Sequence, residues 1–127
     1  MAFLGYDLSP TAVLPGETIY LALYWQALGE MNVSYTVFTH LLDTTQHTWG
    51  QRDSVPGADT LPTTSWMEGE ILTDEYEIVV NPEAPPGEYV IEIGMYDAST
   101  GERLPIHMDG QRLEGDRLLL GVVRVVP

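Results

Sequence analysis

The residues of this chain that could do chemistry are mainly acids, and several of them border one long loop, residues 54–70. The acids in and beside this loop are Asp53, Asp59, Glu68, Glu70 and Asp74. Calcium takes about six to eight oxygen ligands, which carboxylates and backbone carbonyls in loops supply. A structural calcium ion at this loop is therefore one hypothesis, although the sequence lacks the ligand spacing of an EF-hand.

The sequence gives only weak indications of a catalytic site. Paired carboxylates can hydrolyse glycosides, but Glu75 and Glu77 alternate with apolar neighbours, as acids do on the solvated face of a strand. His40 lies mid-strand among bulky residues, which indicates a structural role, and the other two histidines lie near turns. The chain has no Cys, no strand-to-helix serine motif and no pair of histidines at zinc-ligand spacing. We expect no catalytic residue and no cofactor other than the hypothetical calcium ion.

Aromatic residues near loops suggest a second kind of site. Carbohydrate-binding modules present exposed aromatic rings together with a few polar groups, and the candidate ligand-binding residues are Trp49, Trp66 and Tyr96. The competing interpretation is burial, since Trp is usually well buried in proteins. For Trp66, burial would make the ring the apolar anchor of a loop that crosses between two sheets. We expect this structural role and a largely buried Trp66.

The elements that must position these residues are β-strands, because apolar side chains recur with a period of two. The strongest strands are predicted at residues 18–26, 35–43, 89–97 and 117–125, and weaker ones at residues 3–8, 48–53, 71–80 and 103–108. The predicted core-facing side chains of the first three are Ile19, Leu21, Leu23, Trp25, Tyr35, Val37, Thr39, Leu41, Tyr89, Ile91, Ile93 and Met95. Tyr24, Tyr76 and Tyr96 are predicted to face outward.

Nine prolines and twelve glycines punctuate these strands, at the spacing typical of sandwiches. The fold predicted is an all-β, antiparallel, immunoglobulin-like sandwich of seven to nine strands. A length of 127 residues predicts a single domain that spans residues 1–127.

The charge of the chain excludes some partners. The formal net charge is −14, with no Lys and only five Arg, whereas nucleic-acid binding needs clustered basic residues to displace counterions. The same repulsion disfavours an anionic membrane surface. No apolar run approaches the ~20 residues that span a bilayer, so we expect no direct membrane insertion by this segment. The acidity serves either solubility or cation binding.

Several short motifs together resemble a known domain. They are Leu4-Gly5-Tyr6, Pro15-Gly16-Glu17, Leu23-Tyr24-Trp25, Val37-Phe38-Thr39-His40-Leu41-Leu42-Asp43, Gln51-Arg52-Asp53, Pro62-Thr63 with Trp66, Pro85-Pro86-Gly87-Glu88-Tyr89, Gly94-Met95-Tyr96-Asp97 and Thr100-Gly101-Glu102-Arg103-Leu104. The pattern resembles a β-sandwich domain appended to large multi-spanning bacterial membrane proteins. These include glycosyltransferases of the dolichyl-phosphate-mannose mannosyltransferase type and uncharacterised membrane proteins.

The resemblance implies an extracytoplasmic accessory domain, tethered through the rest of its parent protein and excised here from a longer chain. Any transferase chemistry would belong to the membrane part, so no catalytic residue is carried over. The expected function is that of a non-catalytic accessory or interaction domain. Its expected partner is the rest of its own polypeptide or another cell-envelope protein. The alternative is a carbohydrate-binding module that uses Trp49 and Trp66 to bind a glycan.

Overall fold

The computed structural model describes residues 1–127 and is all-β, with two short 3-10 turns and no α-helix. The strands are β1 (Ala2–Ser9), β2 (Ala12–Val13), β3 (Thr18–Gln26), β4 (Thr36–Leu42), β5 (Thr48–Ser54), β6 (Ile71–Val79), β7 (Gly87–Tyr96), β8 (His107–Met108), β9 (Gln111–Arg112) and β10 (Leu118–Val125). The 3-10 turns are η1 (Thr63–Ser65) and η2 (Glu114–Asp116). None of these helical segments has the length and apolar character that crossing a membrane requires.

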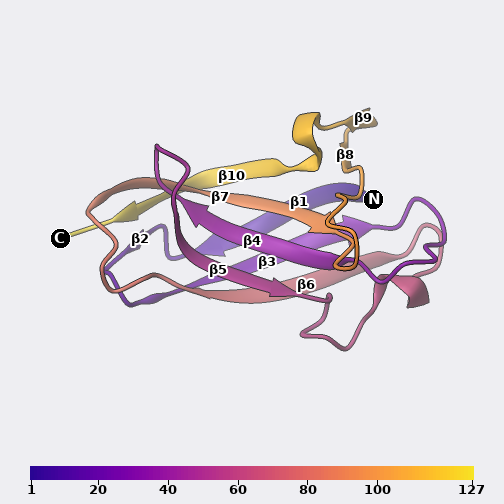
Figure 1. Ribbon diagram of the computed structural model, residues 1–127, viewed down its shortest axis with the longest axis horizontal. Coiled ribbons are helices and arrows are strands. Elements are labelled where there is room, and N and C mark those ends of the chain that lie inside the picture. The colour runs from indigo at the N-terminus through magenta and orange to yellow at the C-terminus, as the bar shows by residue number, and fades with distance from the viewer.

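The strands form two five-stranded sheets, with orders β6-β3-β1-β8-β9 and β2-β10-β7-β4-β5. Figure 1 shows the long strands running side by side along the molecule. Most neighbours are antiparallel, but β1 pairs in parallel with β8 and β10 pairs in parallel with β2. Both sheets are therefore mixed, which differs from the purely antiparallel arrangement predicted.

The strand count also differs from the predicted seven to nine, because three of the ten strands contain only two residues. Such brief pairings show no periodicity that a sequence could reveal. The strand expected at residues 103–108 is an example: only His107 and Met108 form β8. Arg103 makes an isolated bridge to Tyr96 instead.

The inward faces of the two sheets share one core, and the predicted faces of β3, β4 and β7 are confirmed. The buried side chains on these faces are Ile19, Leu21, Leu23, Trp25, Val37, Thr39, Leu41, Tyr89, Ile91, Ile93 and Met95. Tyr35, which was predicted to share this core, is only partly buried and packs at its margin. Tyr76 corrects the prediction, because it is buried in the core rather than exposed on the outer face.

The outer face of the β2-β10-β7-β4-β5 sheet is partly covered. Phe38 points to this face, yet it is buried, and the Arg103 guanidinium lies 4.8 Å from the centre of its ring. The ring packs directly on Gly94, where any side-chain Cβ would overlap it. Glycine at position 94 is therefore required by the close approach of Phe38.

The long loop after β5 is held by two buried residues. The Thr63 hydroxyl donates a hydrogen bond to the Val33 carbonyl at 2.7 Å and accepts one from the Tyr35 amide at 2.9 Å. Trp66 is 2 % exposed, and its indole N–H donates to the Leu61 carbonyl at 3.0 Å. The prediction that Trp66 is a buried anchor of this loop is confirmed.

Candidate functional site

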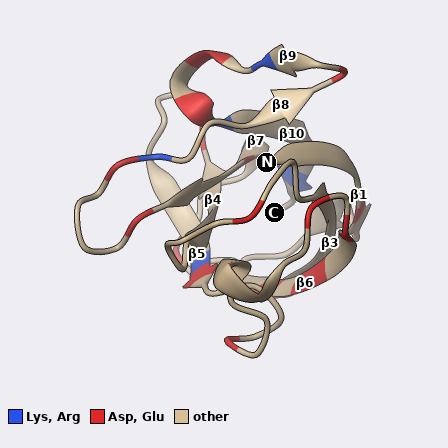
Figure 2. Ribbon diagram, turned by 90° about the vertical axis from the view of Figure 1, so that its right-hand side faces the viewer, with Lys and Arg blue, Asp and Glu red and all other residues tan.

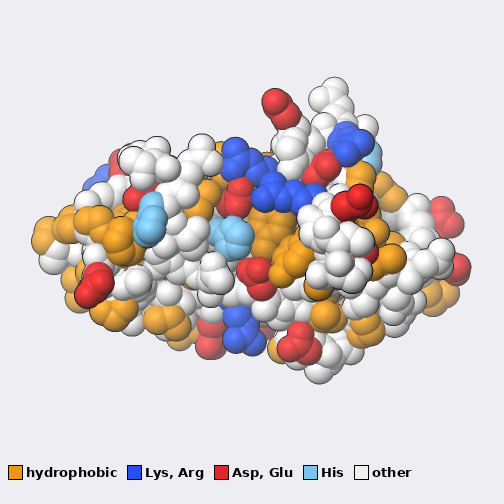
Figure 3. Space-filling model, viewed as in Figure 1, with side chains coloured by type: hydrophobic (Ala, Val, Ile, Leu, Met, Phe, Trp, Pro, Cys, Tyr) orange, Lys and Arg blue, Asp and Glu red, His pale blue; other side chains and the backbone are white.

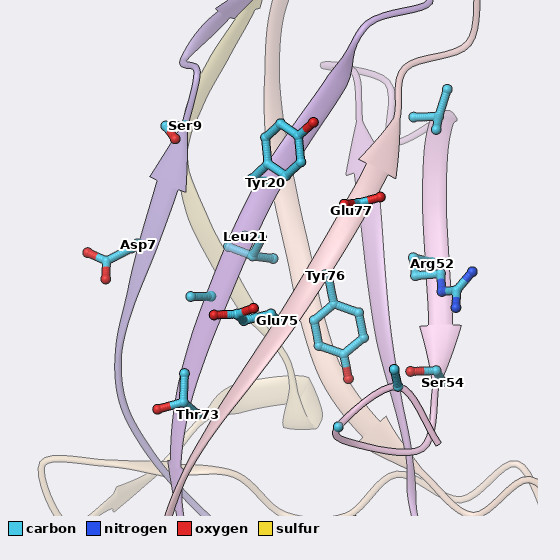
Figure 4. Close-up of a pocket in the computed structure, with 14 residues that line it drawn as sticks. Asp7, Ser9, Tyr20, Leu21, Arg52, Ser54, Thr73, Glu75, Tyr76 and Glu77 are labelled. Atoms are coloured by element: carbon cyan, nitrogen blue, oxygen red, sulfur yellow. The ribbon is translucent and has the colours of Figure 1, made fainter. Parts of the chain in front are cut away.

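An open groove of about 900 Å³ lies along β6, and we call it the β6 groove. It extends from the outer face of the sheet that contains β1, β3 and β6, past β6, to β5 and the turn that follows β5. Its lining residues are Asp7, Ser9, Tyr20, Leu21, Ala22, Arg52, Ser54, Gly57, Ala58, Thr73, Glu75, Tyr76, Glu77 and Val79. Figure 4 shows Glu75, Tyr76 and Glu77 on β6, with Arg52 and Ser54 on the neighbouring β5.

The lining of the β6 groove is acidic and rich in hydroxyl groups, with no His among its residues. In the strand register, Asp7 lies beside Ala22 and Ala22 beside Glu75, which places both carboxylates in one row across the sheet. Tyr20 is 55 % exposed and lies in the next row, beside Glu77. Acidic residues are also spread over strands and loops elsewhere (Figure 2), so the groove is one part of a generally negative surface.

A buried polar cluster lies beneath the groove. The Asp74 carboxylate is buried and accepts hydrogen bonds from the Tyr76 hydroxyl at 2.5 Å and the Gly57 amide at 2.9 Å. Trp25 lies close enough to oppose protonation of Asp74, although its buried indole nitrogen has no partner at hydrogen-bonding geometry. The cluster ties the turn after β5 to β6 and so fixes one end of the groove.

Burial controls the ionisation of this cluster. Desolvation raises the pKa of Asp74, and the hydrogen bonds from Tyr76 and Gly57 oppose that shift only in part. Burial and the neighbouring Asp74 carboxylate also raise the pKa of Tyr76. A carboxyl whose pKa is higher in the folded than in the unfolded state costs stability when it ionises. That cost is present at neutral pH and is removed as the pH falls through the folded-state pKa.

We therefore predict a pH-dependent difference between the wild type and Asp74→Asn. Asn is nearly isosteric and cannot ionise, so the free energy of unfolding of the wild type should rise relative to that of the variant as the pH falls from 7 to about 4. Urea denaturation at several pH values measures the difference, and subtracting the variant cancels the titration of the other acids. A difference that stays constant, or that changes in the opposite direction, would contradict the raised pKa.

The acids proposed for calcium are not gathered into one site. The Asp74 carboxylate already accepts hydrogen bonds within the buried cluster. The Asp59 carboxylate accepts a hydrogen bond from the Val55 amide of its own turn at 3.0 Å. Asp53 lies on the outer face of the other sheet, and Glu70 contacts the nearby Met67 amide at 3.4 Å. Glu68 is exposed. No group of three or more His, Asp or Glu side chains in the chain has an arrangement that could hold a metal ion.

Calcium binding therefore stays a hypothesis, and the geometry leads us to expect a negative result. Ca²⁺ and Mg²⁺ should raise the melting temperature by similar small amounts, because both screen a net charge of −14. Thermal melts with each ion, matched in ionic strength to a NaCl control, measure this. A shift of several degrees with Ca²⁺ alone would indicate a selective site, since Mg²⁺ demands a tighter octahedral geometry.

The three candidate ligand-binding aromatics do not share a surface. Trp66 is buried, so its ring cannot stack on a sugar, which corrects its assignment as a platform. Trp49 is half-buried, and its indole N–H donates to the Asp43 carboxylate at 2.9 Å. Tyr96 pairs with Thr36 at one end of β4, whereas β5 begins beside Leu42 at the other end. Trp49 and Tyr96 therefore lie far apart along the sheet.

A second polar cluster crosses the outer face of the β2-β10-β7-β4-β5 sheet. His40 Nδ1 lies 3.0 Å from Glu92 Oε1 and His40 Nε2 lies 3.6 Å from Asp53 Oδ1. The Arg117 guanidinium donates to Glu92 Oε2 at 2.6 Å, and the Tyr96 hydroxyl donates to Asp53 Oδ2 at 3.2 Å. Figure 3 shows histidine, arginine and acidic side chains next to one another over the middle of this face.

The partners of Glu92 in this cluster favour its ionised form. Burial opposes the ionisation of Glu92, but hydrogen bonds from Arg117 and His40 outweigh it and keep the pKa of Glu92 below its usual value. His40 therefore connects strands β4, β5 and β7 through two carboxylates. Each interaction is internal to the cluster, which is typical of a structural clamp.

Sequence reasoning missed the β6 groove. The alternation of Glu75 and Glu77 with apolar residues was interpreted as a solvated strand face, and both side chains are indeed exposed. Alternation says which face a residue occupies, but not that β6 is the outermost strand of its sheet.

No protein-family model matches the chain, and no curated protein matches it either.

Proposed function

We propose that this chain is a non-catalytic interaction domain that uses the β6 groove as its binding surface. The observation that carries the proposal is the character of that groove: it is open, its volume is about 900 Å³, and carboxylates and hydroxyls line it without any His. An open polar groove is suited to holding a ligand. General acid–base chemistry instead needs a donor or acceptor tuned for proton transfer, and nucleophilic chemistry needs a nucleophile beside a base.

We further propose that the fold is an immunoglobulin-like sandwich. Seven long strands and two sheets that share one core support this, since seven strands in two packed sheets are the hallmark of that architecture. The short parallel pairings of β2 and β8 would be additions at the sheet margins.

The proposed context is an extracytoplasmic accessory domain of a larger membrane-associated protein, which by the resemblance described above would be glycosyltransferase-like. That resemblance supports the context, and the partner would be the rest of the same polypeptide or another cell-envelope protein. Fusing a reporter enzyme that is active only outside the cytoplasm to the chain in its native gene tests the location. An inactive reporter at normal protein levels would reject it.

A carbohydrate-binding module is the second candidate, and one observation favours it. Tyr20 presents an exposed ring within the groove, beside Glu77 and close to the row of carboxylates. Exposed rings with nearby polar groups are what sugars stack upon. Tyr20 would then take the role that the sequence assigned to Trp66.

One set of binding assays separates these functions. The purified domain is screened against a peptide-display library, a glycan array and a panel of chromogenic glycosides and esters, beside Tyr20→Ala and the Glu75→Gln/Glu77→Gln double variant. We expect enrichment of peptides and no turnover. Glycan binding that Tyr20→Ala abolishes would establish the carbohydrate module instead. Turnover that the double variant abolishes would establish an enzyme.

A further inference from the structure

The free edge of β6 is the part of the groove with the most specific binding potential. β6 is the outermost strand of its sheet and pairs only with β3. The Val80 amide donates to the Glu17 carbonyl at 2.9 Å, and the Glu70 carbonyl accepts from the Ala27 amide at 3.0 Å. Even-numbered residues thus direct their backbone groups towards β3 at both ends of the strand.

Backbone direction alternates along a strand, so the odd-numbered residues of β6 direct their N–H and C=O groups away from β3. The Asn81 amide agrees, because it donates to the Trp49 carbonyl on that opposite side at 2.8 Å. Thr73, Glu75 and Glu77 therefore carry the backbone groups of the free edge. Unpaired groups of this kind are a template for an added strand.

Two contacts limit the length of the free edge. At one end β5 crosses close to β6, and a Cβ built on Gly50 would lie 2.8 Å from the Val79 carbonyl oxygen. At the other end the turn after β5 approaches, where the Gly57 amide donates to Asp74. Between these contacts the edge is open over residues 75–78, which is room for a short extended segment.

The charges beside this edge select its occupant. Glu75 and Glu77 point to the outer face, in the rows that contain Asp7 and Ser9. A second copy of the chain would bring the same acids against them, and like charges opposite one another destabilise a strand pair. A segment with Lys or Arg at alternate positions would instead gain cross-strand ion pairs with both acids.

The inner side of an added strand would meet different chemistry. It would face the buried Tyr76 and, across the groove, Arg52 and Ser54 of β5. Arg52 disfavours a cation there, and the buried Tyr76 ring favours small apolar side chains that pack against it. The occupant therefore alternates cationic with small apolar residues.

We propose that the free edge of β6 binds an extended peptide that alternates Lys or Arg with small apolar residues, as an added strand. This is strand addition, in which backbone bonds give affinity and alternate side chains give specificity. The inference rests on the proposed function, because it names the partner of an interaction domain.

The test uses a fluorescent Val-Lys alternating heptapeptide and two N-methylated forms, one methylated at every Lys amide and the other at every Val amide. A strand exposes each set of amides on one edge only. One methylated form should therefore bind like the parent in an anisotropy titration, and the other should lose binding. If it is the Lys-methylated form that fails, the added strand is antiparallel. Equal binding by both forms would mean that only charge attracts the peptide and would overturn strand addition.

Charge variants of the protein complete the test. Glu75→Gln/Glu77→Gln should weaken binding of the parent peptide by about tenfold, because it removes both cross-strand ion pairs. Glu83→Gln/Glu102→Gln removes the same charge from exposed positions away from the groove and should have less than about a twofold effect. Equal weakening by both double variants would reject the β6 site.

Other outcomes separate this inference from the proposed function. Absence of binding by the parent peptide, with another peptide class selected from the display library, would reject the inference and retain an interaction domain. A dimer in sedimentation experiments that Glu75→Gln/Glu77→Gln strengthens, by removing the repulsion between the acids of the two copies, would assign the edge to a second copy. Glycan binding or turnover, measured as described above, would instead reject the proposed function itself.

Discussion

Replacing Trp66 with Ala should lower the free energy of unfolding by about 3–5 kcal/mol, the range found for a buried large aromatic. The ring belongs to the core, and its indole N–H satisfies the Leu61 carbonyl within the loop. The variant would leave a cavity beneath the loop and an unpaired carbonyl. Because native domains are stable by only about 5–15 kcal/mol, this one change should remove a large fraction of the total. Urea or guanidinium denaturation measures it.

Met67→Ala is the matched control, since Met67 follows Trp66 directly and is 71 % exposed. It should change stability by less than about 0.5 kcal/mol. A Trp66→Ala variant as stable as this control would contradict the anchoring role. If such a variant also lost glycan binding, Trp66 would regain its place as a ligand-binding residue.

Leu23→Ala should have the second largest effect, a loss of about 2–5 kcal/mol. Leu23 is 0 % exposed and lies at the middle of β3, the strand between β1 and β6. Removing its branched end opens a cavity between the sheets that neighbouring side chains can fill only partly. The same denaturation measurement applies. If the free energy of unfolding depends on denaturant concentration with the same slope as in the wild type, the variant exposes the same amount of surface on unfolding.

Leu119→Ala provides the same chemical change on a strand of the other sheet. Leu119 is 48 % exposed, so the substitution should cost less than about 1 kcal/mol. A similar loss at both positions would mean that Leu119 is covered in solution, for example by a partner on its face. A loss of stability below about 1 kcal/mol at Leu23 would mean that the inward face of β3 has been assigned wrongly.

Regular alternation made much of the fold predictable. The period of two in β3, β4 and β7 identified nearly all their core-facing residues correctly, because a strand sends successive side chains to opposite faces. The long loop and its anchor at Trp66 were predictable for a similar reason. A loop needs an apolar contact to offset its ordering entropy, and Trp66 is the only large aromatic within it.

Alternation failed where a second layer covers what would otherwise be solvated. Tyr76 was predicted to face outward, but its alternation with the exposed Glu75 and Glu77 is consistent with the inward position that the structure shows. Phe38 is buried on an outer face because Gly94 leaves room for the ring and Arg103 covers it. These contacts join residues far apart in the chain, and no local pattern encodes them.

By itself the sequence determined the all-β class, the inward faces of the main strands, the anchoring role of Trp66 and the net charge of −14. Each of these follows from local periodicity or composition. Only the tertiary structure decided that the loop acids separate, that His40 joins two carboxylates across three strands, and that β6 ends its sheet with free backbone groups beside Glu75 and Glu77. The physical reason is that strand order and the pairing of sheet edges depend on contacts between distant segments, whereas the face of a residue depends on its immediate neighbours.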